Sequence, residues 1–199
     1  ASPRRRELLE QAGVTFRVEP ADIDESVEPN ETPQHAAQRL AVEKAARVSR
    51  EFSEAMVLAA DTVVGVLAAN DTWRLLGKPV DATAATEMLE CLSGRTHVVC
   101  TGIALHCSAH AVRESQVVTT EVDFRTMLPQ EILSYVATGE CYDKAGGYAL
   151  QGAAAAFIAR IRGSHTNVIG LPLSEVLTLL MNYGLWEPAQ LARRHDDEV

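Results

Sequence analysis

The sequence has 199 residues, of which 47% are apolar, and a formal net charge of −9. This length suits one domain, or two small lobes that share a sheet, and the apolar content suffices for a core. The acidic balance argues against a broad surface for nucleic acid or anionic lipid. An anionic ligand would therefore need a local cluster of basic residues.

The cysteines and the apolar runs indicate the compartment. No pair of cysteines has CxxC spacing and no His stands at zinc-finger spacing, which argues against structural zinc and a disulfide framework. No run reaches the 18 apolar residues that span a bilayer, and the first residues include Arg and Glu where a signal peptide would be apolar. We expect a cytoplasmic protein that does not bind membranes.

The first predicted element is a short helix with clear ends. Ser2 is a suitable N-cap, Pro3 suits the first helical position, and Gly13 follows the end. Arginines at positions 4–6 oppose the helix dipole, which disfavours cations there by up to about 1 kcal/mol each. A bound anion would reverse that sign, because free backbone N–H groups, a hydroxyl and guanidinium groups together form a phosphate site. The alternative is a basic turn exposed to solvent.

Next we predict an edge strand at 15–18, an acidic loop at 22–29 and a helix from 33 to about 53. The acids of the loop should mostly be solvated, although one or two could reach a metal. Lys44 falls within the apolar stripe of the helix, between Leu40 and Val48. Its ammonium group either extends to solvent or points into a pocket with a carboxylate or phosphate.

An apolar run at 56–69 contains one carboxylate, Asp61, near its middle. The run is typical of a strand buried on both faces, where an ionised side chain needs a partner. Asp61 is either a structural residue that caps a turn at the strand end, or a carboxylate that faces a cleft there and holds a metal or a water. Thr62 faces the opposite side of an ideal strand, so both can serve one site only if the strand ends or bends here.

The second half alternates helices and strands. Lys78 stands in a tight turn, and residues 139–152 form a glycine-rich loop without a dinucleotide or P-loop signature. The remaining predicted elements are a helix capped by Asp81 and ending at Leu92, an antiparallel hairpin of strands 97–107 and 111–125, a helix at 129–138, a strand at 154–161, a helix at 172–183, and a frayed tail after Trp186.

Seven motifs, in order, resemble those of the Maf family of nucleoside triphosphate pyrophosphatases. They are Ser-Pro-Arg-Arg-Arg-Glu-Leu-Leu at 2–9, Glu-Lys-Ala at 43–45, Ala-Asp-Thr-Val-Val at 60–64, Gly-Lys-Pro at 77–79, Leu-Ser-Gly at 92–94, Asp-Lys-Ala-Gly-Gly-Tyr at 143–148 with Gln-Gly at 151–152, and Val-Ile-Gly-Leu-Pro-Leu at 168–173. The resemblance implies an α/β fold with a mixed, elongated sheet flanked by helices. It also implies one Maf-like domain over 1–199, with two lobes around a central cleft, and a homodimer.

The resemblance implies a role for each residue of the site. Asp61 matches the catalytic acid, acting as general base or metal ligand, and Glu25 matches a second metal-binding carboxylate. The cation would be Mg²⁺ or Mn²⁺. The matched pocket lysines are Lys44 and Lys78, and Ser2, Arg4 and Arg5 belong to the phosphate-binding turn. Thr62 and Gln151, with Arg5, fall where the family sets substrate choice.

The motif at 143–148 resembles the pyrimidine-selective branch, which converts dTTP or UTP to the monophosphate and pyrophosphate. Two alternatives remain: a purine-type enzyme acting on 7-methyl-GTP or deaminated purines, and a non-catalytic nucleotide sensor linked to cell division. The family normally has a strand and an Ala-Ser pair before the Ser-Pro-Arg-Arg turn, whereas this sequence opens at Ala1.

Overall fold

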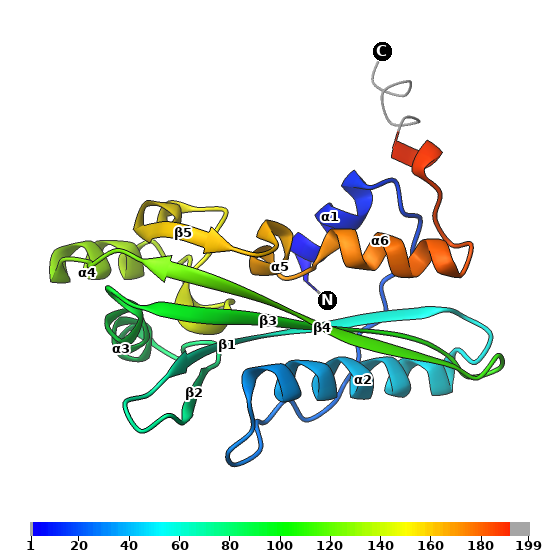
Figure 1. The fold of residues 1–199 in the computed structure, drawn as a ribbon, viewed down its shortest axis with the longest axis horizontal. Helices are drawn as coiled ribbons and strands as arrows, with labels where there is room; N and C mark the ends of the chain where they lie inside the picture. The colour runs from blue at the N-terminus through cyan, green and yellow to red at the C-terminus, as the bar shows by residue number, and fades with distance from the viewer. Residues whose placement is uncertain (1, 192–199) are drawn as a thin grey trace.

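The computed structural model describes residues 2–191 and is built on one five-stranded sheet (Figure 1). The strand order is β2-β1-β3-β4-β5, and all four pairings are antiparallel. The strands are β1 (Val57–Leu67), β2 (Trp73–Leu76), β3 (Thr96–Cys107), β4 (Val112–Phe124) and β5 (Ile158–Arg162). The long β1, β3 and β4 give the sheet its elongated form, which confirms the α/β architecture expected from the sequence. The sheet itself is antiparallel throughout rather than mixed, because within the described chain no helix crosses over between neighbouring parallel strands.

Helices cover both faces of the sheet. In Figure 1, α2 lies below the sheet and α1, α5 and α6 lie above it, whereas α3 and α4 pack at its left end. The helices are α1 (Pro3–Gln11), α2 (Pro33–Glu51), α3 (Ala82–Leu92), α4 (Pro129–Ala137), α5 (His165–Ile169) and α6 (Leu173–Asn182), with short 3₁₀ helices η1 (Ala145–Gly147), η2 (Ala153–Phe157) and η3 (Pro188–Leu191). No helix in the described range is both long and apolar enough to cross a membrane.

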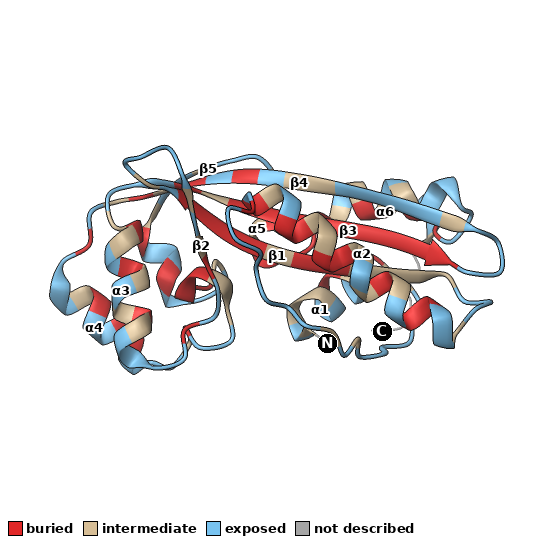
Figure 2. Cartoon of the chain, turned by 90° about the horizontal axis from the view of Figure 1, so that it is seen from below, coloured by how far each residue is buried: buried red, intermediate tan, exposed pale blue. Residues whose placement is uncertain are grey.

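Two hydrophobic clusters divide the molecule into the expected lobes, which Figure 2 shows at opposite ends of the sheet. One cluster joins α3 and α4 to the sheet through residues such as Leu89, Val122 and Ile132. The other joins α1 and α6 to β3 through residues such as Leu8, Ile103 and Val176. Because β1 and β3 run through both lobes, the sheet fixes one lobe relative to the other.

Helix α2 lies unusually close to the sheet. A Cβ atom placed on Gly102 of β3 would come within 2.1 Å of the Ala37 carbonyl oxygen, and one on Gly65 of β1 within 2.3 Å of Pro33 Cγ. Only glycine, which has no Cβ atom, permits so close an approach. Gly102 is paired with Asp61 across the ladder, so α2 approaches the sheet beside this carboxylate.

Most predicted elements are present, but two predictions were wrong and one helix was not predicted. Residues 15–18 form no strand, because the sheet ends at β2 and β5 and leaves this exposed segment without a partner. The strand predicted at 154–161 begins as the helix η2 and becomes β5 only at Ile158, because its run of alanines has low strand propensity. The five-residue α5, which Ser164 caps, is too short to show a helical period and was missed.

The cysteines and the C-terminal segment also bear on predictions. All four cysteines are free thiols in the structure, and three of them, Cys100, Cys107 and Cys141, are buried. Trp186 is buried and donates a hydrogen bond from Nε1 to the Ala12 carbonyl at 2.7 Å, and the first described residues of the predicted tail form η3. The rest of the tail, 192–199, lies outside the described residues.

Candidate functional site

A cleft of about 530 Å³ opens between the two lobes, beside β1. All nine side chains predicted for the site line this one cavity: Ser2, Arg4, Arg5, Glu25, Lys44, Asp61, Thr62, Lys78 and Gln151. They come from α1, the 22–29 loop, α2, β1, the turn after β2 and the loop after η1. Among the described lining residues, five are cationic and three are carboxylates, so the cleft is locally basic in an acidic protein.

Asp61, Lys44 and Glu25 form a charged cluster on the α2 side of the sheet. Lys44 Nζ contacts Asp61 Oδ1 and lies 2.7 Å from Glu25 Oε1. The side chains of Asp61 and Lys44 are only 12% and 14% exposed. Lys44 therefore points into the pocket rather than to solvent. Its hydrogen bond holds the pKa of Glu25 below the ordinary value, which favours the ionised carboxylate.

Arg5 of α1 makes three hydrogen bonds to β1 and to the residue that follows α5. Nε donates to the Gly170 carbonyl at 2.7 Å, Nη1 to the Ala60 carbonyl at 2.6 Å, and Nη2 to Thr62 Oγ1 at 2.9 Å. Burial lowers the pKa of Arg5, while nearby Asp61 raises it. Arg5 thus holds β1 against α1 and the end of α5, and two of its five N–H donors have no acceptor among the described residues.

The free edge of β1 explains how Asp61 and Thr62 serve one cleft. Asp61 does not lie at a strand end: it is in the interior of β1, so that expectation was wrong. Strand β2 pairs with β1 only over residues 64–67, and residues 57–63 have no partner on that side within the described chain. The cleft therefore reaches both faces of β1 around this open edge. Asp61 and Thr62 can both line it although β1 neither ends nor bends at Thr62.

The loop after α4 brings further charged residues to the cleft that sequence reasoning did not single out. Asp143 Oδ2 lies 3.2 Å from Arg4 Nη1, so this ion pair connects α1 with the loop. Lys144 contacts Asp143 and donates to the Glu140 carbonyl at 2.6 Å. Their place in the 143–148 motif was the available signal, but only the fold shows that this loop lies across the cleft from α1.

The remaining predicted residues lie around the opening. Lys78 and Gln151 are exposed, and Ser2 is partly buried and makes no capping hydrogen bond through its side chain. The turn with Lys78 is joined to the glycine-rich loop of residues 139–152, called the motif loop here, because Gly146 N donates a hydrogen bond to the Gly77 carbonyl at 3.0 Å. The two motifs, almost 70 residues apart in sequence, thus form one wall of the cleft.

Comparison with known proteins decides the family. The profile described as "Maf-like protein" matches residues 1–183. The chain belongs to the Maf family. A Maf relative named dTTP/UTP pyrophosphatase from Syntrophus aciditrophicus (strain SB) is 50% identical over 92% of this chain and 87% of its own length. Relatives with the same name from Anaeromyxobacter dehalogenans (strain 2CP-C) and Clostridioides difficile (strain 630) are 49% and 43% identical, covering 94% and 92% of both chains.

Proposed function

We propose that the protein hydrolyses dTTP, UTP and related pyrimidine triphosphates to the monophosphate and pyrophosphate, and so removes unwanted nucleotides. The observation that carries the proposal is the cleft itself, which five cationic side chains line together with the buried carboxylate of Asp61 on β1. The chain is also close in sequence to relatives named for this reaction.

In this proposal a water attacks the α-phosphorus, and the bond from that phosphorus to the bridging oxygen of the β-phosphate breaks. Asp61 accepts the proton of the water, and pyrophosphate leaves. Lys44, in contact with Asp61, keeps this carboxylate oriented. The phosphate chain is bound by Ser2, Arg4 and Lys78.

The substrate base would lie near Thr62, whose hydroxyl Arg5 holds in place. Arg5 fixes Thr62 by the hydrogen bond at 2.9 Å, and Thr62 Oγ1 is also 2.9 Å from Thr101 Oγ1. A hydroxyl held in this way has a set direction and can discriminate between bases. Gln151 is exposed in the cleft and is free to contact the base.

The residues of the cleft fit a divalent cation. Magnesium commonly binds one or two carboxylates together with substrate phosphates and water, and Glu25 and Asp61 supply two carboxylates around a single cation, the Lys44 ammonium. No group of three or more His, Cys, Asp or Glu side chains in the described range could hold a metal without a substrate. We propose that Glu25 and Asp61 hold Mg²⁺ or Mn²⁺, which would neutralise phosphate charge when bound.

Two further expectations belong to the proposal. The free cysteines support a reducing compartment such as the cytoplasm. A homodimer is expected for a Maf protein, and analytical ultracentrifugation would measure the oligomeric state.

The test is pyrophosphate release from dTTP, UTP, dCTP, GTP, ITP and 7-methyl-GTP with Mg²⁺. We expect dTTP and UTP to be preferred, and Asp61→Asn to lower kcat by about 10²- to 10⁴-fold without unfolding the protein. The matched control is Asp71→Asn, the same change at a turn residue with φ of 58°, a conformation that Asn also tolerates. Preference for a purine triphosphate would favour the purine-type alternative. Binding without turnover would favour the sensor.

A further inference from the structure

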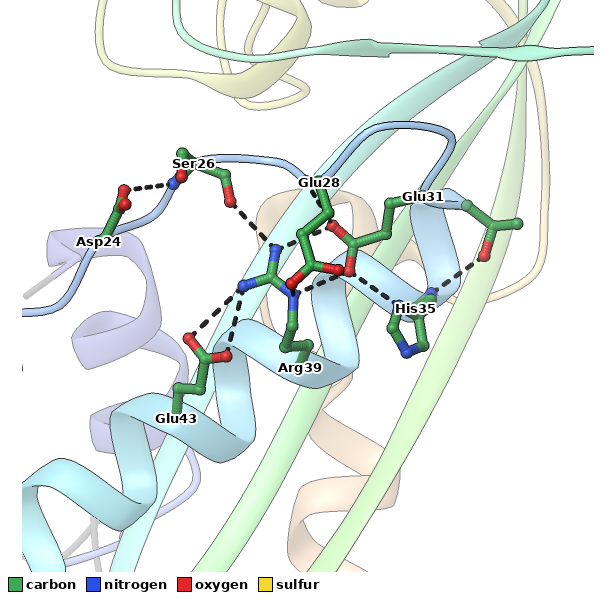
Figure 3. Close-up of polar contacts among 8 residues, drawn as sticks. Asp24, Ser26, Glu28, Glu31, His35, Arg39 and Glu43 are labelled. Atoms are coloured by element: carbon green, nitrogen blue, oxygen red, sulfur yellow. Dashed lines mark hydrogen bonds and ion pairs between the residues drawn. The ribbon is translucent and has the colours of Figure 1, made fainter.

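Glu25 lies on a segment with little structure of its own. Residues 22–29 form no helix or strand, and most of them are exposed. A carboxylate on such a loop reaches a defined position only if contacts elsewhere hold the backbone. Figure 3 shows a candidate for these contacts, a group of charged residues centred on Arg39 of α2.

The centre of this group is an ion pair between the partly buried Arg39 and the buried Glu31. The Glu31 side chain is 1% exposed, and both its oxygens accept hydrogen bonds from Arg39 at 2.8 Å. Glu31 also accepts from the Glu28 backbone N–H at 3.0 Å, and His35 Nδ1 lies 2.8 Å from it. The Arg39 hydrogen bonds lower the pKa of Glu31 to about 2. Such a bidentate pair fixes both orientation and distance.

Arg39 also contacts the loop directly beside Glu25. Nη2 donates to the carbonyl oxygen of Ser26, the next residue, at 3.1 Å, and the Ser26 N–H donates to Asp24 Oδ1 at 2.9 Å (Figure 3). Two residues of α2 therefore hold this loop: Lys44 through the Glu25 carboxylate, and Arg39 through the adjacent backbone.

We propose that Arg39, oriented by Glu31, is a positioning residue that sets where the Glu25 carboxylate stands beside Lys44 and Asp61. Arg39 does not line the cleft and acts through the loop. The proposal rests on the proposed function, because Glu25 is taken there as a ligand of the divalent cation. A merely structural role would instead affect stability and leave the dependence on the cation unchanged.

The test variant is Arg39→Lys, which keeps the charge that Glu31 needs but loses the planar fork that reaches both Glu31 and Ser26. The control is Arg47→Lys on the same helix. Arg47 pairs with Glu51 at 3.4 Å, the same spacing and distance as the pair of Arg39 with Glu43, but it contacts no residue of the loop. If Arg39→Lys does not fold, the double variant Arg39→Gln with Glu31→Gln takes its place, because it removes both charges of the pair and leaves neither unpaired.

We expect Arg39→Lys to raise the Mg²⁺ concentration for half-maximal activity, or lower kcat, by about tenfold, with a smaller change in KM for the triphosphate. Hydrogen exchange should accelerate within residues 22–31 and not in β1. In a Glu25→Gln background the tenfold effect should disappear, because the residue through which Arg39 acts is gone.

If the effects of Arg39→Lys and Glu25→Gln on activity are fully additive, the proposal is overturned. It is also overturned if Arg39→Lys alone leaves both the Mg²⁺ dependence and the hydrogen exchange of residues 22–31 unchanged. A wild-type protein without turnover would refute the proposed function and the catalytic consequence for Arg39 together. Exchange within 22–31 would then still decide whether Arg39 fixes the loop, so the two failures are distinguishable.

Discussion

The close approach of α2 to the sheet makes Gly102→Ala an informative perturbation. The new Cβ would lie 2.1 Å from the Ala37 carbonyl oxygen and 2.5 Å from its carbon, both of them backbone atoms that cannot rotate away. Ordinary contact begins at 3.4 Å, so α2 must retreat by more than about 1 Å. Lys44 moves with α2, whereas Asp61, the ladder partner of Gly102, belongs to the sheet.

Two consequences differ in kind. Overpacking should lower the free energy of unfolding by about 1–3 kcal/mol. Displacement of Lys44 from Asp61 should lower kcat by about 10²-fold, since a shift of about 1 Å at a catalytic group has effects of this size. Both are measured on one preparation, by urea unfolding and by pyrophosphate release from dTTP.

The control is Ala85→Val, which overpacks α3 at a position with no exposed surface and away from the cleft. It should cost similar stability and leave kcat unchanged. If Gly102→Ala keeps its kcat to within about twofold while losing as much stability as this control, the distance between α2 and the sheet does not set the site.

Two other predictions concern the motif loop. His97 is 1% exposed, its Nε2 lies 2.7 Å from the Tyr148 hydroxyl, and burial lowers its pKa from 6.5 to about 4. As the pH falls from 6.5 to 4, the unfolded chain therefore takes up a proton at His97 that the folded chain does not, so the free energy of unfolding should fall by roughly 3 kcal/mol. In urea unfolding, His97→Gln should remove this part of the pH dependence. If the wild type and the variant lose stability in parallel as the pH falls, the prediction is wrong. Gln151→Ala should change the dTTP-to-GTP ratio of kcat/KM by about tenfold with little loss of fold stability, and an unchanged ratio would exclude Gln151 from base selection.

Several features of the site could be read from local patterns. Lys44 stands out because it occupies an apolar stripe, and Asp61 because it interrupts a buried strand. Arg4 and Arg5 stand out because they oppose a helix dipole. Each anomaly is visible within a few residues, since helical and strand periods depend only on neighbouring positions. All four residues do line one cleft.

Other features depended on contacts between distant segments. The sequence predicted chemistry at a strand end, but the short β2 leaves an interior edge of β1 open, and this places Asp61 and Thr62 in one cavity. Likewise, nothing near Arg39 indicated that it would hold the backbone beside Glu25. Strand pairing and loop anchoring join residues far apart in the chain, and no local period records them.

The sequence by itself thus determined the set of charged groups, the order of the main helices and strands, and the family to which they belong. Only the tertiary structure decided which groups meet. Arg5 donates hydrogen bonds to Ala60, Thr62 and Gly170 within the protein, and Arg4 forms an ion pair with Asp143 of the facing loop. The reason is physical: a side chain's type fixes the bonds it can make, while the packing of two lobes along one sheet fixes the partners within reach.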